Sequence, residues 1–251
     1  MQKSFNVKTL GKPLIKSPLK LGYKPNDGIY NYIRESDRIL MENGLHAVLK
    51  DFRNSISPVS FEKAGPRENI YFTPSQTKAA IVTCGGLCPG LNNVIRSIVM
   101  ELFYRYGVKN IIGFQYGFEG LVPGYKHAPV LLNPELVDDI HLHGGSILGS
   151  SRGDQDVKVM VDTLQKSSIN ILFCIGGDGT LRGAEQIFLE VSRRKLSIAI
   201  AAVPKTIDND INYIEKSFGF ETAFSKAHDI LADAHNEAKG FYNGIVVVKL
   251  M

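Results

Sequence analysis

A short polar segment directly after an apolar run carries the residues best suited to chemistry. Residues 203–212 read VPKTIDNDIN, in which Thr206, Asp208 and Asp210 alternate. An extended backbone would turn these three side chains to one side. One carboxylate there can accept a proton from an attacking hydroxyl group, the other can lie against a metal ion, and Lys205 offers a positive charge to a phosphoryl group. The pattern favours phosphoryl transfer, although a solvated turn would also explain the D-N-D letters.

Two glycine-rich turns add a second indication. They read CGGLCPG at 84–90 and IGGDGT at 175–180. Glycines let backbone amides approach a phosphate closely, and the N-terminus of a following helix favours negative charge. A tight strand-to-helix turn is the competing interpretation for either turn alone, but two together favour a phosphate site. The glycines concerned are Gly85, Gly86, Gly176, Gly177 and Gly179.

Three polar side chains accompany these turns. Asp178 stands between glycines, where its carboxylate can reach a hydrated Mg²⁺, an ion usually held by one or two carboxylates plus substrate phosphates. A helix-capping or turn role for Asp178 is the structural alternative, and Thr180 can cap the same helix. Arg152 lies in the small-residue segment GGSILGSSRGD, and its forked donors suit nucleotide phosphates. An exposed arginine in such a loop is also ordinary.

The elements that position these residues alternate between apolar runs and amphipathic stretches from Lys78 onward, which predicts βαβ units and a doubly wound, mainly parallel sheet. In such sheets the loops at the carboxyl ends of the strands converge. We therefore expect the turns around 86, 178 and 208 to meet in one pocket. Strands are expected at 78–84, 110–117, 169–175, 196–204 and 244–251. Helices are expected to begin at Pro89 and at Pro134, the latter with Asn133 as N-cap. Further helices are expected after GGDGT, across 223–238, and along the apolar stripe of Val157, Met160, Val161 and Leu164.

Composition narrows the class of protein. The chain has 251 residues, of which 44% are hydrophobic, and its net charge of +4 comes from interspersed basic and acidic residues. This mixture suits anionic small molecules and argues against nucleic-acid or membrane partners. Three cysteines without a metal-ligand spacing argue against a disulfide framework or a zinc site, so the reducing cytoplasm is expected. Residues 1–76 form an arm rich in Pro and Gly with a short helix at 30–44, and residues 77–251 form the α/β domain.

The motifs GGLCPGLNNVIR, GSSRG, IGGDGTLRGA, PKTIDNDI and FGFETA resemble, in order and approximate spacing, those of 6-phosphofructokinases, and the resemblance covers residues 60–251. The segment AGPRENIYF with its preceding arm resembles the subgroup with long N-terminal extensions. GGDGT alone also occurs in NAD kinases and lipid kinases, which lack PKTIDND. The resemblance implies a Rossmann-like phosphofructokinase fold, Mg²⁺ as cofactor, and glycolytic transfer of a phosphoryl group from ATP to the 1-hydroxyl of fructose 6-phosphate.

The same resemblance assigns roles to residues. Asp208 would be the catalytic base, with Thr206 and Asp210 beside it holding substrate and metal and Lys205 assisting. The nucleotide side would comprise Gly86, Arg152, Gly177, Asp178, Gly179 and Thr180, with Asp178 linked to Mg²⁺. Gly179 would leave room for ATP, because the pyrophosphate-using members tend to carry Asp there. Lys205 is also found in those members, so a pyrophosphate-dependent enzyme is the alternative.

Members of the family continue past VKLM into a second lobe that binds the sugar phosphate. In its full-length form the protein is expected to be a homo-oligomer. The chain is accordingly expected to be a truncated form that keeps the nucleotide side of the site and is inactive when isolated. The remaining alternatives are a non-catalytic nucleotide-binding or regulatory subunit and another small-molecule kinase that shares the glycine–aspartate turn.

Overall fold

The computed structural model describes residues 5, 7–24, 28–54 and 56–250. The chain divides into two compact units, Met1–Pro74 and Ser75–Met251. No helix among the described residues is long and apolar enough to cross a membrane.

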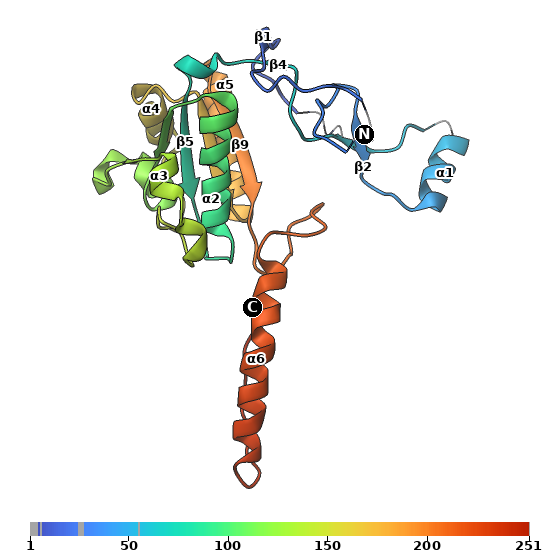
Figure 1. Ribbon diagram of the computed structural model, residues 1–251, viewed down its shortest axis with the longest axis vertical. Helices are drawn as coiled ribbons and strands as arrows, with labels where there is room; N and C mark the ends of the chain where they lie inside the picture. The colour runs from blue at the N-terminus through green and yellow to red at the C-terminus, as the bar shows by residue number, and fades with distance from the viewer. Residues whose placement is uncertain (1–4, 6, 25–27, 55, 251) are drawn as a thin grey trace. The chain divides into compact units, whose positions relative to one another are not determined.

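The second unit is built on a five-stranded sheet (Figure 1). Four strands run parallel and the edge strand β7 is antiparallel to β6. The predicted mainly parallel α/β architecture is therefore confirmed. The strands lie in the order β7 (Val130–Leu131), β6 (Asn110–Gly113), β5 (Lys78–Thr83), β8 (Ile171–Gly176) and β9 (Ala199–Pro204).

Helices cover both faces of this sheet because its central strands alternate apolar side chains between two cores. On β5, Ile81 joins the core beneath α2 (Leu91–Met100) and α3 (Pro134–Val137), whereas Val82 joins the core beneath α4 (Val157–Lys166) and α5 (Asp178–Arg193). A π-helical segment, Glu101–Tyr106, extends α2. Short 3₁₀ helices span Pro74–Gln76, Gly117–Leu121, Pro123–Tyr125 and Ile140–Leu142.

The strand order reverses beside β5. The chain passes from β5 to β6 on one side and then crosses to β8 and β9 on the other. In open α/β sheets, ligands bind outside the carboxyl ends of the strands at such a reversal, where the flanking loops separate. The glycine turn after β5 and the glycine turn after β8 both stand at this point.

Several predicted elements are confirmed with adjusted bounds. Asn133 caps α3, since its side chain accepts a hydrogen bond from the Leu136 amide at 2.8 Å. The helix expected from Pro89 begins at Leu91, because Gly90 takes the left-handed conformation and ends a turn there. The strand expected at 110–117 stops at Gly113. The long helix expected across 223–238 is α6 (Phe220–Lys239).

The strand predicted at 244–251 is wrong for residues 244–250, and Met251 lies outside the described residues. The segment forms no strand, and Ile245 and Val247 are 87% and 88% exposed. A strand needs a neighbouring backbone to satisfy its hydrogen bonds. Within the described residues, no other strand pairs with this segment.

The first unit holds two small antiparallel pairs, β1 (Ile15–Lys16) with β4 (Asn69–Ile70) and β2 (Arg38–Leu40) with β3 (Ser60–Glu62), besides α1 (Leu45–Arg53). The helix predicted at 30–44 is wrong, because β2 occupies part of this range and the helix starts only at Leu45. Pairing decides the outcome: Ile39 lies opposite Phe61, and the Arg38 guanidinium donates to the Ser60 carbonyl at 2.6 Å. Tertiary contacts of this kind override weak local propensity.

Candidate active site

The loop after β5 is fastened to the small-residue loop that precedes α4. The Gly85 amide donates to the Ser151 carbonyl at 2.9 Å, and the Ser150 hydroxyl donates to the Gly85 carbonyl at 2.5 Å. Gly85 has a φ of +80°, a conformation that favours glycine. The neighbouring Gly86 lies so close to Arg152 that a Cβ there would be 3.3 Å from the guanidinium Nη2. The fold thereby brings Arg152 to the first glycine turn.

The turn after β8 leads into α5 at the same edge of the sheet. Gly177 is the N-cap of α5, and Asp178 is its first residue. Thr180 is buried, with its hydroxyl where a Cβ on Gly176 would stand. A Cβ on Gly179 would meet no atom within 4 Å, so this position faces open space. Gly177 and Gly179 carry no side chain at the N-terminus of α5, a composition that favours the approach of an anion.

Lys205 joins the two turns. Its backbone amide donates to the Gly176 carbonyl at 2.9 Å, and its Nζ donates to the Gly86 carbonyl at 2.5 Å. The side chain is only 5% exposed. Burial lowers the pKa of Lys205, and the nearby Arg152 guanidinium lowers this pKa further. Lys205 is thus a buried lysine whose side chain links the two turns by its hydrogen bond to Gly86.

The segment after Lys205 is folded, and the predicted extended row of Thr206, Asp208 and Asp210 is wrong. Asn209 has a φ of +53°, which bends the chain. Thr206 Oγ1 donates to Asp210 Oδ1 at 2.5 Å and accepts from the Asp208 amide at 3.2 Å. These local side-chain bonds replace the extended backbone. The Asp208 residue is exposed, and among the described residues its carboxylate enters no hydrogen bond or ion pair.

This folded segment is held against the first glycine turn. The Ser217 hydroxyl donates to the Thr206 carbonyl at 2.8 Å, and the Cys88 thiol donates to the Phe218 carbonyl at 3.1 Å. Gly219 has a φ of +81°, and a Cβ on it would lie 2.1 Å from the Pro89 carbonyl oxygen. The acidic residues are therefore anchored next to the turn at 84–90.

One cavity of about 720 Å³ opens between the two turns. Its lining includes every nucleotide-side candidate together with Lys205, namely Gly86, Arg152, Gly177, Asp178, Gly179, Thr180 and Lys205. Thr206, Asp208 and Asp210 are not part of this lining and follow Lys205 along the chain. The structure thus gathers the candidate phosphate-binding groups at one place, with the acidic segment adjoining them.

The cavity continues into a wall that the sequence patterns did not single out as part of a site. Phe118, Val157 and Met160 supply apolar surface, and Gln155 and Gln186 supply amides. A Cβ on Gly183 would lie 2.5 Å from the Phe118 ring, so the glycine allows this ring to reach α5. Gly183 follows Gly179 by four residues, so the two glycines lie on the same helix face, and this spacing is the signal in the sequence by which the wall could have been found.

The acidic lining of the cavity is compatible with Mg²⁺ that binds as a complex with a phosphate ligand. Asp178 contributes a carboxylate to the cavity, and no cluster of three metal-ligating side chains occurs within the described ranges. Mg²⁺ is commonly held by one or two carboxylates, water and substrate phosphates. Burial raises the pKa of Cys84 to about 11 and also raises the pKa of Cys88, which disfavours the thiolate form that a nucleophile needs.

Residues 78–251 match the family model described as phosphofructokinase. The chain belongs to the phosphofructokinase family. Among similar curated phosphofructokinases, the ATP-dependent 6-phosphofructokinase of Borreliella burgdorferi is 46% identical over 247 residues, which are 98% of this chain and 54% of that protein. The ATP-dependent 6-phosphofructokinase of Entamoeba histolytica is 54% identical over 190 residues, 76% of this chain and 43% of that protein. The chain spans about half the length of the curated relatives it matches.

Solved phosphofructokinases share the fold. A pyrophosphate-dependent phosphofructokinase from Marinobacter aquaeolei matches 65% of this chain and 42% of its own with a TM-score of 0.57 at 18% identity. The Pichia pastoris phosphofructokinase in the T-state matches 70% of this chain and 20% of its own, also with a TM-score of 0.57, at 22% identity. These likenesses confirm the predicted Rossmann-like phosphofructokinase fold.

Proposed function

We propose that this chain carries the nucleotide side of an ATP-dependent 6-phosphofructokinase, which transfers the γ-phosphoryl group to the 1-hydroxyl of fructose 6-phosphate and gives fructose 1,6-bisphosphate. The observation that carries the proposal is the cavity between the turns after β5 and β8. It combines bare glycine backbone, the N-terminus of α5 and three cations, Arg152, Arg182 and Lys205, at the strand-order reversal. This combination suits a polyphosphate.

The donor side of the reaction follows from this lining. Amides near Gly86 and at the start of α5 would receive the phosphates, and the Arg152 guanidinium would hold them by paired hydrogen bonds. Asp178 would hold Mg²⁺, which supplies charge neutralisation when it is bound with ATP. The apolar wall of Phe118 and Met160 would accommodate the base, because nucleobases stack on apolar and aromatic surface.

Gly179 supports ATP as the donor. The space above it would receive a nucleotide phosphate, since a Cβ there would meet nothing within 4 Å. A carboxylate at this position would fill the space and repel that phosphate. The names of the Borreliella and Entamoeba relatives, both ATP-dependent, support the same choice.

The acceptor side is assigned to the segment after Lys205. Asp208 has an exposed carboxylate that forms no hydrogen bond within the described residues, so it is available to take the proton of the sugar hydroxyl. Thr206 and Asp210, bonded to each other at 2.5 Å, fix the turn that presents it and would contact substrate. Lys205 would keep a positive charge near the transferred group while tying this segment to Gly86.

The proposal extends to organisation and surroundings. Residues 1–76 would act as an N-terminal extension and 77–251 as the nucleotide-binding domain. The complete enzyme would be a homo-oligomer in the cytoplasm. The cytoplasmic location is consistent with the three cysteines, which are all buried free thiols.

Titration of the chain with MgATP tests the donor side. Arg152→Ala should weaken binding at least tenfold, whereas Arg193→Ala, which removes an exposed arginine paired with Glu190 at the far end of α5, should leave affinity within twofold. Equal affinity of both variants, or no MgATP binding by the folded chain, would refute the assignment.

Asp208→Asn tests the acceptor side. It should leave the MgATP affinity within twofold and lower kcat for fructose 1,6-bisphosphate formation by about 10²- to 10⁴-fold, the usual range for loss of a general base. The coupled assay is run on the chain mixed with the C-terminal region of the Borreliella enzyme. An unchanged kcat, or absence of product from the unsubstituted mixture, contradicts the assignment.

A further inference from the structure

One carboxylate in the cavity has no part in the proposed donor or acceptor chemistry. Asp154 lines the cavity together with its neighbours Arg152 and Gln155. The residue is exposed, and its side chain enters no hydrogen bond or ion pair among the residues that the structure describes. An unpaired acidic group should repel the phosphates that the cavity is proposed to hold. A carboxylate in such a cavity needs a favourable contact with the ligand to offset this repulsion.

The nearby Asp156 shows that Asp154 is not needed to begin α4. The Asp156 carboxylate accepts hydrogen bonds from the Lys158 amide at 2.8 Å and from the Val159 amide at 3.3 Å, so Asp156 is the N-cap of this helix. The sequence DQD at 154–156 therefore contains one aspartate with a structural role and one whose oxygens have no partner in the described part of the chain.

The chain is held in place on both sides of Asp154. On one side the Ser151 carbonyl accepts a hydrogen bond from the Gly85 amide at 2.9 Å, which fixes the segment to the first glycine turn. On the other side Asp156 is fixed as the cap of α4. A carboxylate between two such anchors needs little further ordering to meet a ligand, and binding then loses less conformational entropy.

Asp154 also lies between the residues proposed to contact the phosphates and those proposed to contact the base. Arg152, on the phosphate side, is two residues before it, and Val157, in the apolar wall, is three residues after it. Two residues span at most about 7 Å and three at most about 11 Å, so Asp154 is close to both. The ribose joins the base of a nucleotide to its phosphates. The ribose hydroxyls are therefore the groups that Asp154 would meet.

We propose that Asp154 accepts hydrogen bonds from the ribose hydroxyls and makes the cavity selective for ribonucleotides over 2′-deoxyribonucleotides. The inference rests on the proposed function, because it requires a nucleotide in the cavity. An ionised carboxylate only accepts hydrogen bonds, and each of its oxygens can receive a hydroxyl donor. Hydrogen bonds to a charged group are stronger than those between neutral groups, and a deoxyribose leaves the carboxylate without one donor. Acidic residues bind the ribose by the same chemistry in dinucleotide-binding domains.

Calorimetric titration of the chain with the magnesium complexes of ATP and 2′-deoxyATP tests the proposal. The unsubstituted chain should bind the deoxynucleotide about tenfold or more weakly than ATP, as expected for loss of a hydrogen bond to a charged group. Asp154→Ala should weaken MgATP binding by about tenfold or more and change the affinity for the deoxynucleotide by no more than about threefold, so that the selectivity is lost. Magnesium tripolyphosphate, which has no ribose, should bind the variant at least as tightly as the unsubstituted chain.

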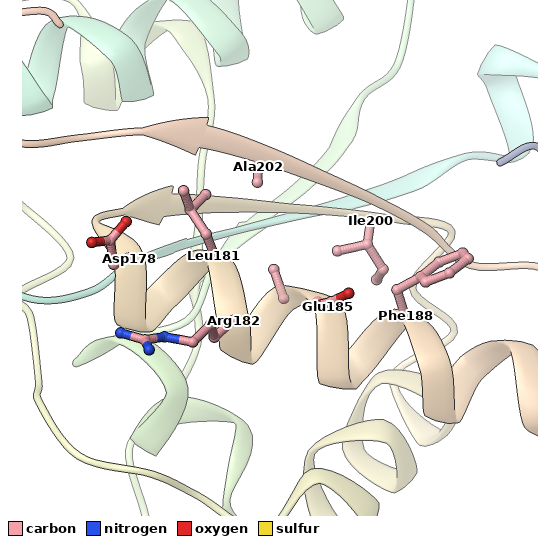
Figure 2. A pocket seen from close by; sticks show the side chains of 8 residues that line it. Asp178, Leu181, Arg182, Glu185, Phe188, Ile200 and Ala202 are labelled. Atoms are coloured by element: carbon pink, nitrogen blue, oxygen red, sulfur yellow. The ribbon is translucent and has the colours of Figure 1, made fainter. Parts of the chain in front are cut away.

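Glu185→Ala is the matched control. Glu185 is also exposed, but it lines the neighbouring hollow between α5 and β9 and is not part of the nucleotide cavity (Figure 2). Its replacement removes one negative charge from the same domain, so a general electrostatic gain in phosphate binding should appear in both variants. The preference of Glu185→Ala for MgATP over the deoxynucleotide should stay within about twofold of that of the unsubstituted chain.

Four results would overturn the proposal while leaving the nucleotide site in place. Equal affinity of the unsubstituted chain for the two nucleotides would show that the cavity does not select the ribose. Unchanged selectivity in Asp154→Ala would assign the contact to another residue. Tighter binding of both nucleotides and tripolyphosphate to that variant would show that the carboxylate only repels phosphate, and weaker binding of all three would make it a metal ligand. Absence of MgATP binding by the unsubstituted chain would instead refute the proposed function on which the inference rests.

Discussion

Gly179→Asp is the substitution that most directly probes the cavity. Gly179 is the second residue of α5, its φ is not in the left-handed region, and a Cβ there meets no atom within 4 Å. The folded backbone accepts an aspartate without a clash. Replacing glycine in the first turn of a helix by an acidic residue should raise stability by roughly 0.5–1 kcal/mol through propensity and the helix dipole.

The same carboxylate should oppose a nucleotide phosphate. Two like unit charges about 5 Å apart at an effective dielectric constant of about 20 repel by about 3 kcal/mol. Because Gly179 is exposed, solvent screening reduces this to about 1–3 kcal/mol, which corresponds to roughly 5- to 150-fold weaker binding. Pyrophosphate, which lacks the nucleotide's α-phosphate, should lose less affinity than ATP.

Calorimetric titration with MgATP and with magnesium pyrophosphate measures both affinities, and thermal unfolding measures stability. Gly179→Ala is the matched control, since it adds a methyl group without charge and should leave MgATP affinity within a few fold. If Gly179→Asp is folded and binds MgATP as tightly as Gly179→Ala, the space above Gly179 does not hold a nucleotide phosphate.

Three further measurements follow from the geometry. MgATP affinity should fall as pH rises through the pKa of Lys205, which burial holds below the ordinary value of 10.5, and Lys205→Met should flatten this part of the profile; an unchanged profile would remove Lys205 from the phosphate site. In the same window the unfolded chain binds more protons at this group than the folded chain, so the Lys205 contribution to the free energy of unfolding should rise with pH. Gly219→Ala should cost about 2 kcal/mol or more in denaturant unfolding, because a left-handed φ and the Pro89 carbonyl both oppose a Cβ, while Gly124→Ala, with open space and an ordinary φ, should be nearly neutral. Iodoacetamide at pH 8 should modify Cys84 slowly in the native chain and quickly after unfolding, because burial raises its pKa to about 11; rapid native modification would show that the thiol is accessible.

Local sequence patterns were sufficient to predict those helices, strands and caps that depend on their own residues and a few neighbours. The apolar run of β5, the stripe of α4 and the Asn133 cap are all readable along the chain. Two predictions of the same kind failed at 30–44 and 244–250. In both, strand formation depended on whether a partner backbone lay alongside, which β3 provides for β2 and which no described strand provides for 244–250.

The α/β class and the glycine turns could be predicted from the amino-acid sequence, because periodicity and turn chemistry act over a few residues, and the motifs indicated the family by resemblance. The three-dimensional fold was needed to show that Lys205 is buried and bound to Gly86, 119 positions away, that Arg152 contacts the same turn, and that Asp208 lies in a folded segment. Contacts between residues so far apart in the sequence depend on the order of the strands in the sheet. The burial and the electrostatic environment of these side chains are set by residues from distant parts of the chain, which a local sequence pattern does not include.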